Sequence, residues 1–371
     1  MSFRPTRMEV SLENYRHNYR TIKEHVKRRV IAVLKADSYG MGVVPVAWTL
    51  KSEGADFFAV ATPDEALALR SAGIPDPILV LGSSPYETAR EYVRKGIRAA
   101  ITDQAMAEEL SREAVRLGCT AYVHLKIDSG MGRIGFLHPS VREIASKLHH
   151  LPGIKTEGVF THFATSDEAD LSYTHKQFKS FMKSVDIIRE AGLSPTMIHC
   201  CNSGAVLADL SEMFCDAVRP GHIVSGLIPT PECGKSVHIK PCFEVKTAIG
   251  AVRELPADMG ISYGLTYTTE RPTVTAVLPI GYADGYSRSL SNKGDVLIHG
   301  KRCRIIGRIC MDQCIVNISD VPEAKPGDEV VLIGRQGGES ITIEEYAEAI
   351  GGITAMVPVM FTARVPRVYI D

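Results

Sequence analysis

Over roughly its first 225 residues, the chain alternates between helix-like and strand-like patterns of hydrophobic and polar positions. The first helix-like segment follows an N-cap at Ser11 and has apolar residues at spacings of three and four, which predicts one buried face. These apolar positions are Leu12, Tyr15, Tyr19, Ile22 and Val26. The continuous apolar run 30–34 comes next, and its shortness predicts a strand buried on both faces of a parallel sheet.

Strand-like runs of this kind recur with helix-like segments between most of them. The eight runs are 30–34, 57–62, 77–82, 98–102, 120–127, 156–162, 197–201 and 216–219. Thr62 and Glu65 form a capping box around Pro63, and Gly73 ends the helix that follows. Gly96, Gly118 and Gly192 are expected to end other helices. Eight βα units predict a (β/α)8 TIM-like barrel, with an open doubly wound sheet as the alternative.

Beyond about residue 235 the pattern changes to short β-branched runs separated by Gly, Pro and Asn. This sequence pattern predicts a second domain that is mostly β. We expect a barrel over 1–235 and a β domain over 236–371, packed together because no low-complexity linker separates them.

Composition narrows the function classes. The 371 residues carry a net charge of −1, which argues against a nucleic-acid or anionic-membrane partner. No apolar run is long enough to span a membrane and the first residues lack a signal core, so we expect a cytoplasmic protein. The nine cysteines lack zinc-binding spacing, which favours reduced thiols and no metal.

Polar residues follow the ends of several predicted strands, where barrel enzymes place their chemistry. Lys35 follows an apolar run that would lower its pKa and favour a nucleophilic amine, although a lysine can also reach out to solvent from such a position. Asn202 and Ser203 open a helix and Gly221 follows the last strand, which offers donors for a phosphate. A plain N-cap and a tight turn would explain the same residues.

His162, His199 and Arg219 also fall at strand ends. Taken singly, His162 is more often a satisfied, partly buried histidine and Arg219 a structural ion-pair partner. A lysine nucleophile, a phosphate cradle and several cations on one rim together suggest pyridoxal 5′-phosphate held as a Schiff base.

The segment 32–42, which reads AVLKADSYGMG, resembles the cofactor-lysine motif of bacterial alanine racemases. Other segments similar to that family follow in family order and extend the resemblance over nearly the whole chain. They are 126–133, 161–164, 202–203, 219–221, 261–264, 281–285 and 310–313. The architecture implied by the resemblance is a barrel followed by a β domain.

The resemblance implies a racemase that interconverts L- and D-alanine with two bases, Lys35 on one face of the substrate and Tyr263 on the other. Because a phenol with a pKa of about 10 is a weak base, the family links its tyrosine through His162 to Arg219. Arg219 would contact the cofactor's pyridine nitrogen and His199 would orient Arg219. Without the family, Tyr263 would be read as a core aromatic.

Further roles rest on the resemblance alone. Tyr39, Ser203 and Gly221 match phosphate contacts, and Arg133 matches a substrate-carboxylate partner. Lys126 matches a lysine that is often carbamylated, although a surface strand lysine is the alternative. On the substrate side, the matching residues of the second domain are Tyr282, Met311 and Asp312. The family takes its tyrosine from a second subunit, which implies a homodimer with shared active sites and a role in D-amino acid supply for a cell wall.

Two positions depart from the family pattern. Ala355 stands where the family usually has a tyrosine, and the missing ring makes serine or broader specificity the alternative to alanine. His222 replaces an apolar residue and would either reach the cofactor phosphate or cap the loop.

Other classes fit the sequence less well. A pyridoxal-dependent decarboxylase would pair the pyridine nitrogen with a carboxylate rather than with Arg219. A pyridoxal carrier would need neither Tyr263 nor a second domain, and a Schiff-base aldolase would not explain the second-domain motifs.

Overall fold

The computed structural model describes residues 3–371 and divides them into two units, one of residues 14–240 and one of residues 3–13 with 241–371. The sequence analysis placed the N-terminal segment in the barrel domain. In the structure, β1 (Arg7–Ser11) pairs antiparallel with β11 (Phe243–Ala248) and parallel with β21 (Arg367–Ile370). Its alternating burial is typical of a strand within a sheet, which explains why the segment joins the β unit.

The larger unit contains a nine-stranded parallel sheet within the described residues 3–371, in the order β2-β10-β9-β8-β7-β6-β5-β4-β3. β2 (Arg29–Val30) and β3 (Ala32–Val33) are two pieces of one predicted strand. They pair with the two ends of the sheet, β10 and β4, so the sheet closes on itself. The barrel prediction is therefore confirmed, and the open-sheet alternative is wrong.

All the predicted barrel strands occur close to their expected positions. Their bounds are β4 (Phe58–Val60), β5 (Ile78–Val80), β6 (Arg98–Ile101), β7 (Ala121–Lys126), β8 (Ile154–Phe160), β9 (Met197–His199) and β10 (Ala217–Val218).

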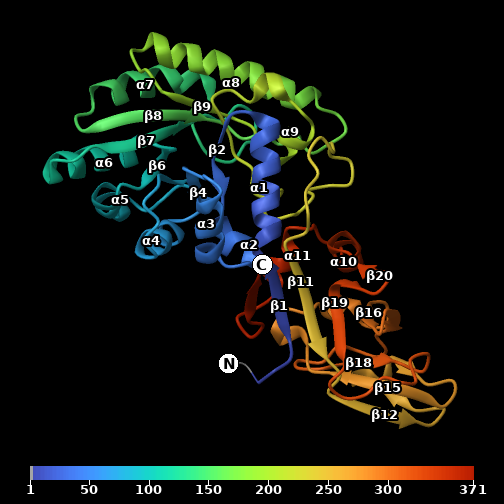
Figure 1. Cartoon of the computed structure of the whole chain (residues 1–371). Helices are drawn as coiled ribbons and strands as arrows, with labels where there is room; N and C mark the ends of the chain where they lie inside the picture. The colour runs from blue at the N-terminus through green and yellow to red at the C-terminus, as the bar shows by residue number, and fades with distance from the viewer. Residues whose placement is uncertain (1–2) are drawn as a thin grey trace. The chain divides into compact units, whose positions relative to one another are not determined.

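Helices lie outside the barrel strands, as Figure 1 shows for α4 to α8. The helices of this unit are α1 (Leu12–Val26), α2 (Lys35–Gly40), α3 (Val43–Ser52), α4 (Pro63–Ser71), α5 (Ala89–Lys95), α6 (Gln104–Leu117), α7 (Val141–His150), α8 (Ser172–Glu190) and α9 (Ser203–Leu207), with short 3-10 turns at Tyr86–Thr88, His138–Ser140 and Ser211–Met213.

Local signals in the sequence explain where these helices begin and end. α1 buries Tyr15, Tyr19, Ile22 and Val26, as the spacing predicted. Thr62 and Glu65 form the expected capping box of α4. α5 and α6 end at glycines in the left-handed conformation, Gly96 and Gly118.

The smaller unit is mostly β, as predicted. Its remaining strands are β12 (Ala251–Leu255), β13 (Gly260–Ile261), β14 (Tyr267–Thr268), β15 (Thr273–Leu278), β16 (Asp295–Ile298), β17 (Lys301–Arg304), β18 (Cys314–Asn317), β19 (Glu329–Gln336) and β20 (Glu339–Ile341). α10 (Ile343–Ile350), α11 (Met356–Met360) and 3-10 turns at Tyr263–Leu265, Tyr282–Asp284 and Arg288–Leu290 complete it. The central strand of its main sheet, β19, buries Val330 to Ile333 between neighbours β16 and β11.

None of the helices within residues 3–371 combines the length and apolar character of a membrane span. No group of three His, Cys, Asp or Glu side chains in that range is arranged to hold a metal ion.

Candidate active site

A cavity of about 470 Å³ lies at the carboxyl ends of the barrel strands. Lys35 follows β3, His162 follows β8, and Arg219 follows β10. The sequence-predicted residues that line the cavity are Lys35, Tyr39, Lys126, Arg133, His162, Asn202, Ser203, Arg219, Gly221 and His222. The structure thus brings together groups that lie up to 187 residues apart in the chain, from Lys35 to His222.

The turn after Lys35 has an unusual backbone. Four consecutive residues, Ala36 to Tyr39, have φ angles of 53 to 55° and form a left-handed turn. This conformation costs about 1–2 kcal/mol per residue for side chains other than glycine. Glu65 holds the turn, because its carboxylate accepts a 2.6 Å hydrogen bond from the Ala36 N–H. Asp37 adds a second restraint by accepting from the Val43 N–H at 2.7 Å.

The surroundings of Lys35 favour a neutral amine. Burial and the charge of Arg133 lower the pKa of Lys35, while Glu65 opposes the shift. The apolar strand before Lys35 predicted this direction, and the structure adds the cationic neighbour Arg133. A lysine with a lowered pKa presents more of the nucleophilic form at neutral pH.

Arg219 is buried, with 4% of its surface exposed, and is held by acceptors other than carboxylates. It donates to the carbonyl oxygens of Thr161 at 2.6 Å and Cys200 at 3.1 Å. Its other contacts are with the ring nitrogens of His199 at 3.0 Å and His162 at 3.4 Å. Within residues 3–371 no carboxylate forms an ion pair with it, and burial lowers the pKa of Arg219 to about 10.

The two histidines beside Arg219 differ in exposure. His162 lines the cavity, whereas His199 is fully buried behind Arg219 and does not line it. Burial, together with the charge of Arg219, holds the pKa of each imidazole well below its usual range. Both rings are therefore neutral and can accept hydrogen bonds from the guanidinium.

Ser203 and Gly221 form another part of the cavity lining. The Ser203 hydroxyl oxygen accepts a 3.0 Å hydrogen bond from the Gly221 N–H, and the Asn202 side chain caps α9 as predicted. A Cβ at Gly221 would come within 2.2 Å of the Tyr39 hydroxyl oxygen, so any other residue there would displace the Tyr39 ring. His222 packs its ring 5.2 Å from that of Tyr39, centroid to centroid.

The His222 imidazole is available to a ligand. Burial and the charge of Lys35 lower the pKa of His222 to about 4, so the ring is neutral at pH 7. His222 lines the cavity, and within residues 3–371 neither of its ring nitrogens has a hydrogen-bond partner.

Lys126 is 2% exposed, so the alternative of a surface strand lysine is wrong. Its ammonium donates to the carbonyl oxygens of Ile127 at 2.8 Å and Ile134 at 3.3 Å. Burial lowers the pKa of Lys126 to about 8. Nearby, the Asp128 carboxylate accepts from four consecutive backbone N–H groups, from Gly130 to Arg133, and so fixes the loop that presents Arg133.

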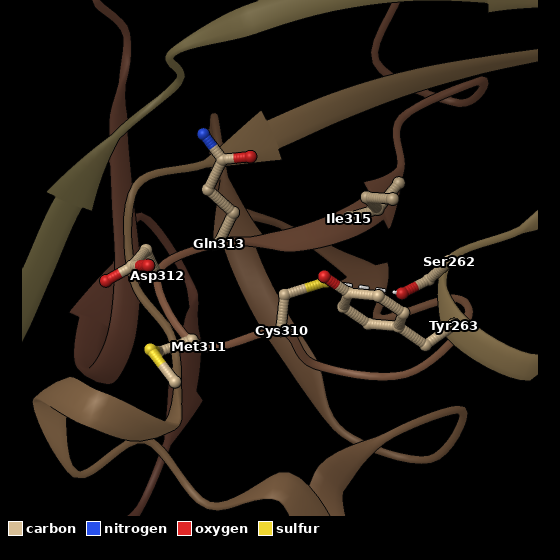
Figure 2. A pocket seen from close by; sticks show the side chains of 7 residues that line it. All are labelled: Ser262, Tyr263, Cys310, Met311, Asp312, Gln313 and Ile315. Atoms are coloured by element: carbon tan, nitrogen blue, oxygen red, sulfur yellow. Dashed lines mark hydrogen bonds between the residues drawn. The ribbon is translucent and has the colours of Figure 1, made fainter.

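Tyr263 belongs to the smaller unit and lines a separate cavity of about 450 Å³ (Figure 2). It is 69% exposed, so its interpretation as a core aromatic is wrong. Figure 2 also shows Ser262, whose hydroxyl lies 3.3 Å from the Cys310 sulfur. Ser262 donates as well to the Arg308 carbonyl at 2.6 Å, which anchors the turn that carries Tyr263.

The other candidates of this unit lie on two adjacent segments. Tyr282 shares a cavity of about 260 Å³ with Tyr263, while Met311 and Asp312 line the larger one. The Tyr282 N–H donates to the Cys310 carbonyl at 3.1 Å, which joins the segments. Ala355 precedes α11 and is not among the described residues that line these two cavities.

Some residues that shape the barrel cavity escaped the sequence analysis. The lining includes Leu81, Met131, Phe160, Phe163, Asp167 and Pro229, for which the sequence carries no separate signal. Glu65 was identified only as a capping-box residue. A carboxylate near the lysine turn in space cannot be recognised from a separation of thirty positions in sequence.

Family models and known proteins that are similar to this chain include alanine racemases. The family model described as alanine racemase, N-terminal domain, matches residues 10–229, and that described as alanine racemase, C-terminal domain, matches residues 242–369. Alanine racemase 2 of Caldanaerobacter subterraneus is 43% identical, covering 99% of this chain and 95% of its own length. The alanine racemase of Desulfovibrio desulfuricans is 42% identical, covering 99% of both chains.

Solved structures with a similar fold include two alanine racemases. The alanine racemase of Streptomyces lavendulae superposes with a TM-score of 0.95 at 33% identity, covering 100% of this chain and 98% of that one. The alanine racemase of Bacillus anthracis with bound L-Ala-P gives a TM-score of 0.94 at 36% identity, covering 100% and 96%.

Proposed function

The chain belongs to the alanine racemase family, and from that premise we propose that it interconverts L- and D-alanine with pyridoxal 5′-phosphate as its cofactor. The observation that carries this proposal is the presence of the Lys35 amine and the Arg219 guanidinium in one cavity at the strand ends. The relatives and solved structures described above are all called alanine racemases, which favours alanine over the serine alternative.

The donor set of the cavity fits pyridoxal 5′-phosphate. Lys35 supplies an amine with a lowered pKa. The missing Cβ at Gly221 lets the Tyr39 hydroxyl lie close to the same backbone that contacts the Ser203 hydroxyl, so that two hydroxyl groups would face a phosphate. His222 adds an imidazole without another partner among residues 3–371. Arg219 would face the pyridine nitrogen. When bound, this cofactor withdraws electrons from the substrate Cα and weakens its C–H bond.

Racemisation requires proton transfer on both faces of the substrate Cα. Lys35 would hold the cofactor, then act through its Nζ as the base on one face. The Tyr263 hydroxyl would donate or accept the proton on the other face. Tyr263 is exposed and lacks a hydrogen-bond partner within the described residues, which leaves its hydroxyl open to a substrate or to a second subunit.

Arg219 would set the strength of electron withdrawal. A guanidinium is a permanent donor, so Arg219 beside the pyridine nitrogen would disfavour protonation of that nitrogen. The cofactor would then withdraw electrons less strongly, which would suit rapid return of the proton to the substrate Cα.

Arg133 would bind the substrate carboxylate, with Tyr282, Met311 and Asp312 on the opposing side. Lys126 is suited to carbamylation, because a pKa of about 8 leaves a substantial fraction of neutral amine. That amine would form an N–C bond to carbon dioxide and release one proton. The resulting carbamate would hold Arg133 by charge-assisted hydrogen bonds.

The active protein would be a homodimer in which Tyr263 of one copy serves the cavity of the other. The exposure of three neighbouring apolar or aromatic side chains supports a dimer. Tyr263, Leu265 and Met311 are 69, 66 and 52% exposed, respectively. Exposed side chains of this size mark contact surfaces. We further propose that the enzyme works in the cytoplasm and supplies D-alanine for a cell wall.

Deuterium incorporation tests the proposal. Cofactor-loaded protein given L-alanine in D₂O should yield D-alanine carrying deuterium at Cα, and Lys35→Ala should yield none. Loss of L-alanine without D-alanine, or without exchange at Cα, would contradict a racemase.

A further inference from the structure

A line of hydrogen-bonded side chains extends from Arg219 into the barrel interior, and the proposed reaction does not use it. Arg219 Nη1 lies 3.0 Å from His199 Nδ1, and His199 Nε2 lies 2.8 Å from His124 Nδ1. His124 Nε2 in turn lies 3.2 Å from Glu157 Oε2. Arg98 donates to the same Glu157 oxygen at 3.1 Å and ends the line.

Burial increases along this line toward its centre. His124 and His199 are completely buried, and Arg219 is 4% exposed. The side chains of Arg98 and Glu157 are 16 and 18% exposed, so they form the outer end. The line therefore connects a partly exposed ion pair to the cavity through two imidazoles shielded from water.

The backbone is shaped to allow this arrangement. Val123 pairs with Thr156 and the next residue, His124, pairs with Gly158, which leaves Glu157 as the extra residue of a β-bulge. Bulges redirect side chains and are common near active sites. A Cβ at Gly158 would come within 2.4 Å of His124 Nδ1, so glycine makes room for the imidazole.

The direction of every hydrogen bond follows from the two ends. A guanidinium can only donate, so His199 Nδ1 must accept from Arg219 and the ring proton is on Nε2. That N–H donates to His124 Nδ1, which places the His124 proton on Nε2. The His124 N–H then donates to the Glu157 carboxylate, which can only accept when ionised.

The charge states agree with this direction. Burial lowers the pKa of both His124 and His199, so each neutral ring carries one proton. Although burial opposes the shift, hydrogen bonds from His124 and Arg98 lower the pKa of Glu157 to about 2. The carboxylate is thus ionised at neutral pH and selects one tautomer of its neighbour.

The opposite tautomers would disrupt the cavity. With its proton on Nδ1, His124 would donate toward His199 Nε2 and force the His199 proton onto Nδ1. Two donors, His199 Nδ1–H and Arg219 Nη1, would then oppose each other across 3.0 Å. Arg219 would have to rotate away or lose a partner.

We propose that Glu157, supported by Arg98, is a positioning residue that holds His124 and His199 in their Nε2–H tautomers and thereby fixes the Arg219 guanidinium at the cavity. The tautomers are a property of the chain itself, whereas the kinetic consequence rests on the proposed racemase function.

NMR of the full-length protein labelled with ¹⁵N-histidine tests the tautomers directly, with signals assigned from single variants at His124 and His199. We expect both residues to be protonated on Nε2, with and without pyridoxal 5′-phosphate. Protonation of His199 on Nδ1 in the unaltered protein would overturn the proposal, whatever the variants do.

Two substitutions at Glu157 separate positioning from packing. Glu157→Leu removes the acceptor and leaves Arg219 as the one end that selects the tautomer, so we expect part of the His199 proton population to move to Nδ1 and kcat to fall roughly tenfold with KM for alanine little changed. Glu157→Gln keeps an acceptor oxygen, so the Nε2–H tautomer of His199 and kcat should both be those of the unaltered protein. Glu143→Leu, which breaks an exposed pair with Lys147 on α7, is the matched control and should change neither.

The outcomes are decisive in combination. If Glu157→Leu leaves the His199 tautomer and kcat unchanged, or if Glu157→Gln loses as much as Glu157→Leu with the tautomers intact, the positioning role is refuted. Should the unaltered protein fail to racemise alanine while both histidines are protonated on Nε2, the proposed function fails and the tautomer assignment stands.

Discussion

At the scale of single residues, burial rather than ion pairing sets the charge of the groups around the barrel cavity. Burial lowers the pKa of Lys35, Lys126 and Arg219. The same cause keeps His162 and His199 neutral. At neutral pH the two lysines therefore hold a larger fraction of neutral amine than they would in water, the two histidines are neutral, and Arg219 stays protonated.

Attachment of the cofactor to Lys35 should depend on pH in a defined direction. The neutral amine reacts, so the rate should rise with pH and reach half-maximum below the 10.5 of an ordinary lysine. Arg133→Gln removes a nearby positive charge and raises the pKa of Lys35, which moves the profile to higher pH. The measurement is the rate of appearance of the visible absorption of bound cofactor.

Arg142→Gln is the control for this profile, because Arg142 pairs with Glu190 on the exposed face of α7 and α8. It should leave the midpoint unchanged. A profile that Arg133→Gln does not move would contradict the assigned cause of the Lys35 shift.

Tyr263→Phe should affect the two enantiomers unequally. Removal of the hydroxyl eliminates one of two proton-transfer groups, with an expected loss of about 10²–10⁴-fold for the enantiomer whose α-proton faces it. Exchange of the α-proton with solvent, measured separately for L- and D-alanine, reports each face. Equal losses for both enantiomers would argue against a base on each face.

The residue scale also shows what sequence could and could not predict. Lys35 and Arg219 were recognisable because strand ends and motif order mark them. The charged neighbours of Lys35 were not, because Glu65 and Arg133 come near it only through the closed barrel. Tyr263 shows the reverse, since local sequence favoured a core aromatic and only the family resemblance indicated a role for it in an active site.

At the scale of elements, close approaches between turns shape the cavity. The left-handed turn Ala36–Tyr39 brings Tyr39 against the loop after β10, where Gly221 lies. Strain of this kind persists where surrounding contacts impose it, and here Glu65 and Asp37 do so. The turn was not predictable, because its residues carry no glycine or asparagine signal for positive φ.

Gly221→Ala should weaken binding of pyridoxal 5′-phosphate. The added Cβ would lie 2.2 Å from the Tyr39 hydroxyl oxygen, so the phenol must move out of the phosphate side of the cavity. Tyr39→Phe removes that oxygen and should recover part of the affinity in the double variant. Equilibrium titration of the cofactor-free protein measures each Kd.

Gly338→Ala is the matched control, because a Cβ there meets no atom within 4 Å. It should bind the cofactor as the unaltered protein does. Equal affinity of Gly221→Ala and the unaltered protein would show that this contact does not shape the site.

Among the elements, the barrel strands were predicted most closely, because continuous apolar runs mark strands that are buried on both faces. The N-terminal strand was not assigned to the β unit, since alternation in a five-residue segment does not reveal its partners. The split of strand 29–33 also depends on closure of the sheet, which no local pattern encodes.

At the scale of the whole molecule, the groups proposed to react are divided between two units. Lys35 and Arg219 lie in the barrel unit, and Tyr263 lies in the β unit with its side chain exposed. The proposed dimer accounts for this division, because each active site would combine a barrel cavity with the tyrosine of the other copy.

Mixing two inactive variants tests the shared site. Lys35→Ala and Tyr263→Phe each remove one base, and a mixed dimer would contain one site with both bases intact. After the two proteins are unfolded and refolded together, racemase activity should reappear. Each variant refolded alone is the control, and absence of recovery in a mixture shown to contain mixed dimers would contradict a shared site.

The most direct test of the central claim is chiral chromatography after the cofactor-loaded protein has been given L-alanine and L-serine separately, with kcat/KM compared. We expect D-alanine to form with a kcat/KM well above that for serine. A serine value equal to or above that of alanine would show that the tyrosine missing at Ala355 has redirected specificity. Absence of D-alanine while the cofactor is visibly bound would contradict the proposed reaction itself.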